Sequence, residues 1–470
     1  MTGIPLIITF VISIVVMILA ISKFKVHPFL AIMGISLILA LIVGIPIVDI
    51  PATADSPAVS GIASIIGAGF SSTFAGIGIV IILGALVGVL LEKTGAAIKL
   101  ADMVVSAVGK KRPELAIMIM GWIVSIPVFC DSGFVILDPI RKALRKRTMA
   151  SSVSMTVALS AGLYASHVFI PPTPGPIAAA GAAGLADSLL LVMGFGALIS
   201  IPTLIAAYFY AMYIGKKVKS TEDFEDDGEI TNTYEDLVKE YGKLPNGFAA
   251  IAPILMPILL MALSSVVVAM KMSGPMIDVI RFLGHPMLAL TVGLLFGIYL
   301  LYVSGKLASF NQITNDTLKT VGPILFVTAA GGVLGRVIAS AGFIEYIRGN
   351  ATAISTIGIF FPFIIAAILK SAQGSSTVAI TTTAGMLGSY LASDSLMVAL
   401  GLTTPVLAAL AVMAIGAGAM TVSHANDSYF WVVTNFGGMK AEDGYKTQTA
   451  VTLVMGIAAM IAIFIFSLIF

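Results

Sequence analysis

The sequence predicts an all-α polytopic membrane protein, and its composition and its apolar runs both point to this class. Of the 470 residues, 58% are hydrophobic and only 11% are charged, whereas a soluble domain carries about 25% charged residues. Several apolar stretches approach the length of about 20 residues that a membrane-spanning helix needs. The chain is therefore expected to lie in a lipid bilayer. Its composition excludes a soluble enzyme, a nucleic-acid-binding protein and a disordered protein.

The predicted spans follow one another along the whole chain. They are 4–22, 28–47, 74–91, 151–170, 189–213, 248–270, 286–303, 321–339, 396–417 and 448–470. The first is not expected to be a removable signal, because no basic residue precedes it and Lys23 and Lys25 follow it. The positive-inside rule places these lysines in the cytoplasm and both termini outside a cytoplasmic (plasma) membrane that the chain crosses many times.

An interrupted stretch at 113–140 is bracketed by basic residues on both sides. Both of its ends are therefore expected in the cytoplasm. The stretch is too short for two full spans, which need about 40 residues. We interpret it as a re-entrant hairpin that turns near 129–133; the alternative is one long tilted helix.

A hydrophilic segment at 215–247 divides the chain into two membrane halves, 1–214 and 248–470. It carries nine acidic and five basic residues, and three lysines at its start predict that it is cytoplasmic. We interpret this segment as a linker between the halves.

The two halves carry the same features in the same order. A glycine trio with the spacing G-x3-G-x6-G comes first, then an interrupted apolar segment with a polar tip, then a helix that ends in Ser-His. The glycines are Gly84, Gly88 and Gly95 in the first half and Gly331, Gly335 and Gly342 in the second. We interpret the trios as small residues that allow helices to pack closely.

The interrupted segments also correspond between the halves. A hairpin at 353–392 and a broken helix at 396–437 match the hairpin at 113–140 and a broken helix at 151–187. The first glycine helix is predicted to run inward and the second to run outward. This pattern predicts two inverted repeats whose interruptions meet near the bilayer midplane, where secondary transporters bind substrate. Alternating access would then come from one repeat-built domain moving against the other.

Ionisable residues at membrane depth are costly and often mark functional sites. Lys370 precedes a tip of small hydroxyl residues, and a cation beside a helix N-terminus suits a carboxylate. Alternatively, Lys370 reaches the membrane interface or pairs with an acid such as Asp131. Arg336 pairs with Glu345, caps a helix or contacts substrate. The residues expected to bind substrate are Asp131, Ser132, Gly133, Thr173, Gly175, Lys370, Gln373, Gly374, Ser375, Ser376, Thr377 and Asn426.

Four residues are candidates for carrying a proton. His167 and His424 occupy matching positions in the two halves, and imidazole titrates near physiological pH. A lone buried histidine is, however, more often a hydrogen-bonded structural residue. Asp131 and Asp427 are the alternatives, because a carboxylate in a dry site can take up a proton near neutrality.

Motifs for other chemistries are missing from the sequence. There is no Gly-x4-Gly-Lys-Ser/Thr loop for ATP. There is also no Cys/His metal spacing and no acidic cluster for a magnesium-dependent lipid-phosphate enzyme. We therefore expect neither a cofactor nor a metal nor an enzymatic activity.

Four pieces of the chain resemble the gluconate permease (GntP) family, part of the ion-transporter superfamily. They are 129–134, His167 with 171–176, 372–379 and 423–431. The resemblance covers nearly the whole chain. It implies a proton symporter that imports sugar acids or related hydroxy or amino acids. It also implies an elevator-like protomer, with a scaffold and a moving transport domain, in a homodimer.

Two departures from the family pattern lie at the expected site. Asp131 stands where gluconate-type members have a glutamate, and Thr173 replaces the histidine of their Pro-Pro-His-Pro-Gly-Pro run. The substrate is therefore expected to be gluconate-like, or another small carboxylate such as glycerate or a D-amino acid. Any proton role of the missing histidine is absent or has moved.

Three other interpretations stay open at the sequence level. Sodium could replace the proton, with oxygen ligands from Asn426, Ser428, Ser375 and Thr377. The chain could instead be a passive organic-anion channel, although hairpins on both sides fit a carrier better. A membrane enzyme or a subunit of an energy-transducing complex is the third class.

Overall fold

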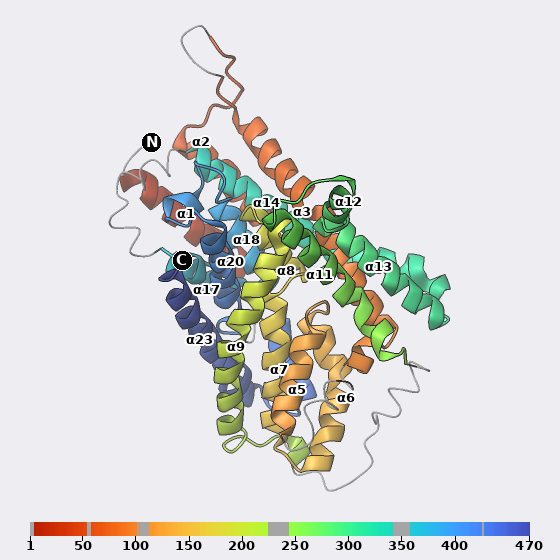
Figure 1. Cartoon of the computed structure of the whole chain (residues 1–470). Helices are drawn as coiled ribbons and strands as arrows, with labels where there is room; N and C mark the ends of the chain where they lie inside the picture. The colour runs from red at the N-terminus through yellow and green to blue at the C-terminus, as the bar shows by residue number, and fades with distance from the viewer. Residues whose placement is uncertain are drawn as a thin grey trace.

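The computed structural model describes residues 4–53, 58–100, 103, 112–223, 244–341, 358–424 and 427–470. Within these residues every extended regular element is a helix, and the one β-bridge joins Ile50 to Val59 (Figure 1). Six helical segments of this described part are long and apolar enough to cross a membrane. The all-helical prediction is confirmed.

The helices of the described residues lie on both sides of the predicted linker. The first half has α1 (Ile4–Ser22), α2 (Pro28–Val43), α3 (Ile62–Lys93), α5 (Pro113–Val124), α6 (Cys130–Thr148), α7 (Ser152–Phe169), α8 (Pro174–Ala182), η1 (Ala186–Ser188) and α9 (Leu189–Ile214). After η2 (Thr221–Asp223), the second half has α11 (Gly247–Ala269), α12 (Pro275–Leu283), α13 (Pro286–Val303), η3 (Leu307–Ser309), α14 (Phe310–Ser340), α17 (Phe360–Gln373), α18 (Ser376–Leu387), α19 (Leu396–Ala399), α20 (Pro405–Met420), α21 (Ser428–Phe436), α22 (Ala441–Gly444), η4 (Tyr445–Thr449) and α23 (Ala450–Ser467). α3 and α14 are long helices. Each is followed by a pair of shorter helices, then by an interrupted helix and then by a final long helix.

Two helices are longer than the predicted spans because hydropathy detects only their apolar part. α3 and α14 cover the predicted spans 74–91 and 321–339 but begin well before them. The first turns of α14 expose Asn311 and Asp316 while they bury Ile313 and Thr317. Residues four apart lie on one helix face, so this amphipathic stretch extends the helix beyond its apolar run.

The predicted broken helix at 396–437 is divided twice. A short helix, α19, ends before Gly401, whose φ of 80° lies in the left-handed region. α20 then begins at Pro405, with the Thr404 side chain accepting a hydrogen bond from the amide of Leu407. Proline at the first position and threonine at the cap both favour a helix start there.

The helices form two packed groups. α3 and α14 lie along each other and contact α2, α11 and α13 (Figure 1). The second group is built around α7, all of whose residues are buried, and includes α5, α6, α9, α17, α20 and α23. Burial on every face places α7 in the centre of this group. α8 and α18 contact each other and both groups, because α8 packs on α3 and α18 packs on α14.

Glycines of the two trios stand where backbones approach closely. A Cβ atom added at Gly88 would collide with the carbonyl oxygen of Pro127, and one added at Gly335 would collide with that of Gly385. The contacts support close packing as the role of these residues. Gly342 lies outside the described residues.

Replacement of Gly335 by alanine is expected to destabilise the protein by about 1–3 kcal/mol, because the new methyl group overpacks the contact between α14 and α18. Gly322 on the same helix is the matched control, since nothing lies within 4 Å of a Cβ added there. Gly322→Ala should be neutral or stabilising, because alanine is the better helix former. Thermal unfolding of the detergent-solubilised variants measures both effects. Equal melting temperatures would contradict the packing role.

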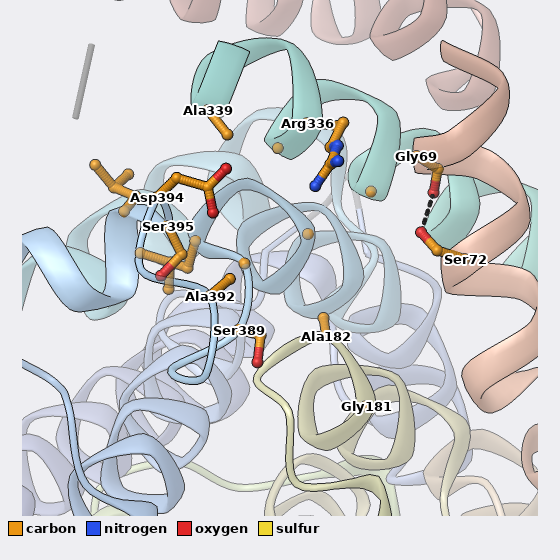
Figure 2. Close-up of a pocket in the computed structure, with 16 residues that line it drawn as sticks. Gly69, Ser72, Gly181, Ala182, Arg336, Ala339, Ser389, Ala392, Asp394 and Ser395 are labelled. Atoms are coloured by element: carbon orange, nitrogen blue, oxygen red, sulfur yellow. Dashed lines mark hydrogen bonds between the residues drawn. The ribbon is translucent and has the colours of Figure 1, made fainter. Parts of the chain in front are cut away.

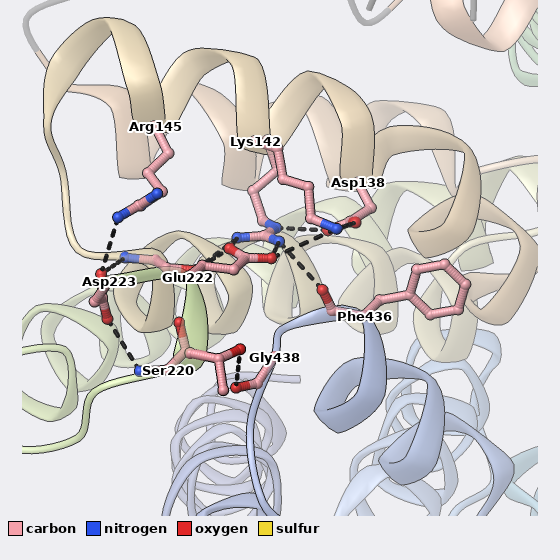
Figure 3. Close-up of polar contacts among 11 residues, drawn as sticks. Asp138, Lys142, Arg145, Ser220, Glu222, Asp223, Phe436 and Gly438 are labelled. Atoms are coloured by element: carbon pink, nitrogen blue, oxygen red, sulfur yellow. Dashed lines mark hydrogen bonds and ion pairs between the residues drawn. The ribbon is translucent and has the colours of Figure 1, made fainter. Parts of the chain in front are cut away.

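The start of the predicted linker is packed against the rest of the protein. Glu222 accepts hydrogen bonds of 2.8 and 2.9 Å from the two terminal nitrogens of Arg141, which lies within α6 (Figure 3). Arg141 also donates to Asp138 at 2.7 Å and to the carbonyl of Phe436, at the end of α21. The amide of Thr221 donates to the carbonyl of Gly438 at 3.0 Å. This cluster joins α6, the linker start and the end of α21.

The ion pairs of Glu222 predict a loss of stability in acid. Burial opposes ionisation of its carboxyl, but hydrogen bonds and charge from Arg141, with Ser152 and Lys142, outweigh it and lower its pKa. Such a carboxyl stabilises the fold above its unfolded pKa, and this contribution is lost as the pH falls through the folded pKa. The loss is therefore expected below about pH 4.5, the ordinary value for Glu.

The measurement is the melting temperature as a function of pH. Glu222→Gln should be less stable than the wild type at pH 7 and should lose less stability between pH 5 and pH 3. Parallel curves for the two proteins would contradict this assignment.

Candidate functional site

The four interruptions of the helices meet at one place in the protein. They are the turn between α5 and α6, the break between α7 and α8, the turn between α17 and α18, and the break between α20 and α21. Phe129 from the first lies against the ring of His167 at the second, with centroids 5.8 Å apart. Side chains from the third and fourth are joined by an ion pair, and a hydrogen bond joins the fourth to the first.

Lys370 is the cation of this site. It lies in the last turn of α17 and is fully buried. Its Nζ lies 2.6 Å from Oδ2 of Asp427 and also donates to the carbonyl of Gly374, the left-handed residue that ends α17. A positive charge at a helix C-terminus is stabilised by the helix dipole. Lys370 therefore pairs with Asp427, rather than with Asp131 as the alternative prediction had it.

Asp427 caps α21 and has hydrogen bonds to both of its oxygens. Oδ1 accepts from the amide of Tyr429 at 3.1 Å, and Oδ2 accepts from the Ser423 hydroxyl at 2.5 Å as well as from Lys370. An aspartate at this position satisfies a helix amide that otherwise lacks a partner. Asp427 thus holds Lys370 and fixes the start of α21 at the same time.

Asp131 lies in the first turn of α6 and is more open than Asp427. Its Oδ1 accepts from the Ser428 hydroxyl at 3.1 Å. Among the described residues, its Oδ2 receives only a long contact of 3.6 Å from the thiol of Cys130. Ser428 follows Asp427 directly in the chain. The two carboxylates are therefore neighbours at a site in which Lys370 is the buried cation.

The two predicted histidines differ in their surroundings. His167 is buried between the rings of Phe129 and Tyr164, and within the described structure its Nδ1 has no hydrogen-bond partner. His424 is half-buried and has its Nε2 3.2 Å from the carbonyl oxygen of Ser371, in the second hairpin. Most buried polar atoms in proteins are hydrogen-bonded, so the Nδ1 of His167 is an exception to the usual pattern.

Other predicted site residues are used within the fold. The Thr173 hydroxyl donates to the carbonyls of His167 and Ile170 and so braces the break before α8. A Cβ on Gly175 would lie 3.1 Å from Ile380, and one on Gly133 would lie 2.6 Å from Leu163. These glycines pack α8 on α18 and α6 on α7.

The tip between α17 and α18 is compact. Ser375 caps α18 by accepting from the amide of Val378 at 3.3 Å, and Ser376 and Thr377 are buried behind it. Gly374 contributes its carbonyl to Lys370. The side chains of Ser132 and Gln373 and all of Asn426 lie outside the described residues.

Sequence reasoning missed several residues that contact the predicted ones. The Tyr164 ring centroid lies 5.7 Å from Nζ of Lys370, and the ring stacks on His167. Tyr164 and His167 are three positions apart, so a shared helix face was the available signal. Ser423, four residues before Asp427, was also missed and donates to that aspartate. Ser428 was predicted only as an alternative sodium ligand, and it donates to Asp131.

The arrangement suits a ligand that combines a carboxylate with hydroxyl or amino groups. Lys370 is a cation for the carboxylate, and the half-free Asp131 is an acceptor for hydroxyl or ammonium hydrogens. The two charges come from different halves of the chain.

Comparison with known proteins gives consistent results over the whole chain. The protein-family model described as "GntP family permease" matches residues 4–469. The chain is 32% identical to the inner membrane permease YgbN of Escherichia coli over 451 residues, which cover 94% of each protein. It is 28% identical to a gluconate permease of Pseudomonas aeruginosa, covering 97% of this chain and 96% of that one. It is also 28% identical to the Gnt-II system L-idonate transporter of Escherichia coli, covering 92% and 96%.

Two solved transporter structures share the fold. The YdaH transporter of Alcanivorax borkumensis has a TM-score of 0.62 at 14% identity, covering 93% of this chain and 98% of its own. MtrF of Neisseria gonorrhoeae, described as one of a class of antimetabolite efflux pumps, has a TM-score of 0.59 at 14% identity, covering 94% and 96%.

Proposed function

This chain belongs to the GntP family of permeases, and we propose that it imports a small hydroxy-carboxylate across the cytoplasmic membrane by proton symport. The resemblance seen in the sequence is thereby confirmed, and the protein is a transporter rather than an enzyme. The observation that carries the proposal is the buried Lys370–Asp427 pair beside Asp131, at the meeting point of four helix interruptions.

Sugar acids are the proposed substrates. The relatives include proteins named gluconate permease and L-idonate transporter. The substrate carboxylate binds Lys370 and the tip that carries Ser375, and its hydroxyl groups bind Asp131 and Ser428. Asp131 is shorter than the glutamate of gluconate-type members. Glycerate and D-amino acids are therefore also proposed as substrates.

Charge balance supports the proton. Lys370 carries one positive charge, and Asp427 and Asp131 carry one negative charge each. A bound carboxylate adds a further negative charge in a poorly solvated place, where like charges are costly. One proton taken up with the substrate cancels the negative charge that the substrate adds. Asp131 is the first candidate for the carrier because its carboxylate has fewer hydrogen bonds than that of Asp427. His167 is the second because its Nδ1 has no partner within the described structure.

Movement is proposed to follow the two helix groups. The repeated order of helices supports two inverted repeats, and inverted repeats place the binding site at their interface. The group of α3, α14, α2, α11 and α13 is the scaffold, and the group around α7 is the transport domain of an elevator in each protomer of a homodimer. Both termini lie outside, and the Arg141 cluster faces the cytoplasm.

Uptake into liposomes tests the function. Purified protein is reconstituted and given labelled gluconate, glycerate or D-serine, with an inward proton gradient or with an inward sodium gradient at fixed pH. Proton-driven, saturable uptake of one of them supports the proposal. Uptake driven only by sodium would show that sodium, not the proton, is the coupling ion. Non-saturating flux without coupling would indicate a channel. No uptake of any organic acid would reject the proposal.

A further inference from the structure

A second polar cavity lies at the far end of α18 from Lys370. Its volume is about 290 Å³, and it lies between α3, α8, α14, α18 and the loop that follows α18 (Figure 2). The polar side chains of its lining are Ser72, Arg336, Ser389, Asp394 and Ser395. None of these residues contacts Lys370 or Asp427, so the cavity is separate from the site described above.

Arg336 is the cation of this cavity. It is exposed on α14, and within the described part of the chain no carboxylate lies in ion-pair distance of it. Glu345, its predicted partner, lies outside the described residues. A guanidinium presents its donors in a planar fork that matches a carboxylate. Figure 2 shows Arg336 on α14 and Asp394 on the loop as separate parts of the lining.

Hydroxyl groups on the loop are free to donate hydrogen bonds. The Oγ of Ser389 accepts from the amide of Leu391, and the Oγ of Ser395 accepts from the amide of Val398, each at 3.1 Å. Within the described structure neither hydroxyl donates to a protein group. A serine hydroxyl has one proton to donate besides its lone pairs. The cavity therefore combines a cation, an anion and two available hydroxyl donors.

Two helices connect this cavity with the Lys370 site. α18 begins with Ser376 beside the tip and ends at Leu387 in the cavity wall. Its 12 residues span about 18 Å at 1.5 Å per residue. α8 packs along α18 and runs from the break near His167 to Gly181 and Ala182 in the same wall. A solute in the cavity is therefore at the other end of the helices that form the candidate site.

We propose that this cavity is a second, peripheral binding site for the transported solute, in which Arg336 binds the carboxylate. Asp394 accepts from hydroxyl or ammonium hydrogens of the same molecule, and Ser389 and Ser395 complete the contacts. The ligand class is a monocarboxylate that bears hydroxyl or amino groups. The site captures the solute on its way to Lys370, and this role rests on the proposed function. A competing explanation is a gap for helix sliding, since glycines such as Gly332, Gly335 and Gly388 also line the cavity.

Sided transport kinetics separate these explanations. Arg336→Gln, Arg336→Lys and the control Lys319→Gln are reconstituted into liposomes in one known orientation. Lys319 is an exposed cation of the same helix that does not line the cavity and that pairs with the exposed Asp316. Labelled gluconate is then offered from the cavity side or from the opposite side, at low and at high ionic strength.

Arg336→Gln is expected to raise the KM about tenfold from the cavity side, with kcat unchanged and with no change from the opposite side. Its kcat/KM should also depend less on salt, because the steering charge is gone. Arg336→Lys keeps the positive charge and should therefore raise the KM less than Arg336→Gln does. Lys319→Gln should behave as the wild type. Asp394→Asn should raise the KM for gluconate without changing inhibition by acetate, which has no hydroxyl group.

Chemical rescue supplies a check that does not depend on folding. Arg336→Cys treated with a trimethylammonium-ethyl methanethiosulfonate should recover a low KM, whereas the sulfonatoethyl reagent should not. Untreated and treated wild type control for the buried Cys130.

Defined results would overturn the inference. A wild-type KM for Arg336→Gln on both sides, or an equal rise on both sides, would contradict a capture site. The same phenotype in Glu345→Gln would make Arg336 a partner of Glu345 instead. If the wild type carries no organic acid at all, both the proposed function and the capture site are rejected. If the wild type transports the acid and Arg336→Gln has the same KM, only the capture site is rejected.

Discussion

Replacement of Lys370 by methionine is expected to abolish uptake of the organic acid and to destabilise the protein by about 3–5 kcal/mol. The substitution removes the proposed partner of the substrate carboxylate. It also leaves Asp427, which is buried and 2.6 Å from Nζ in the native protein, without its counter-ion. An isolated buried charge is far more costly than a buried pair.

The double variant Lys370→Met/Asp427→Asn separates binding from folding. Removing both charges should recover much of the lost stability, because neither charge is then left unpaired. Uptake should stay abolished, since the cation is still missing. Thermal unfolding and gluconate binding are measured on the same preparations. Lys370→Met with wild-type affinity would remove this residue from the substrate site.

Replacement of Arg141 by methionine is expected to cost a similar 3–5 kcal/mol, without touching the candidate site. The Arg141 side chain is fully buried and bonded to Asp138, Glu222, Ser152 and the carbonyl of Phe436. Its loss leaves two carboxylates without their main partner and detaches the linker start from α6 and α21 (Figure 3).

Lys142→Met is the matched control for Arg141→Met. Lys142 contacts the same Asp138 and Glu222, but 34% of its side chain is exposed. Solvent screens such a pair, so its removal should cost about 1 kcal/mol or less. Melting temperatures of the two variants are compared at pH 7. Similar losses in both would show that burial of Arg141 does not strengthen the cluster.

Much of the fold was predictable because its causes are local. Apolar runs of about 20 residues require helices in a membrane, where the backbone must satisfy its own hydrogen bonds. Proline and glycine then mark the interruptions, as at Pro174, Gly374 and Pro405, each of which begins or ends a helix in the structure. The repeated order of these signals is the basis of the proposed correspondence between the two halves.

The candidate site was predictable in its members but less so in its contacts. Lys370, Asp427, Asp131 and His167 lie together at the interruptions, as their rarity at membrane depth suggested. Two other predicted residues, Thr173 and Gly175, are used in packing.

The amino-acid sequence by itself determined that this is a helical membrane protein, and which polar residues lie where its helices are interrupted. Only the tertiary structure decided that Lys370 pairs with Asp427 rather than Asp131, and that Glu222, near the start of the linker, pairs with Arg141 of α6. Helix and span signals depend on residues a few positions apart. Ion pairs between residues 57 and 81 positions apart depend on how the finished helices pack, because a buried charge takes whichever partner the packing brings within about 3 Å.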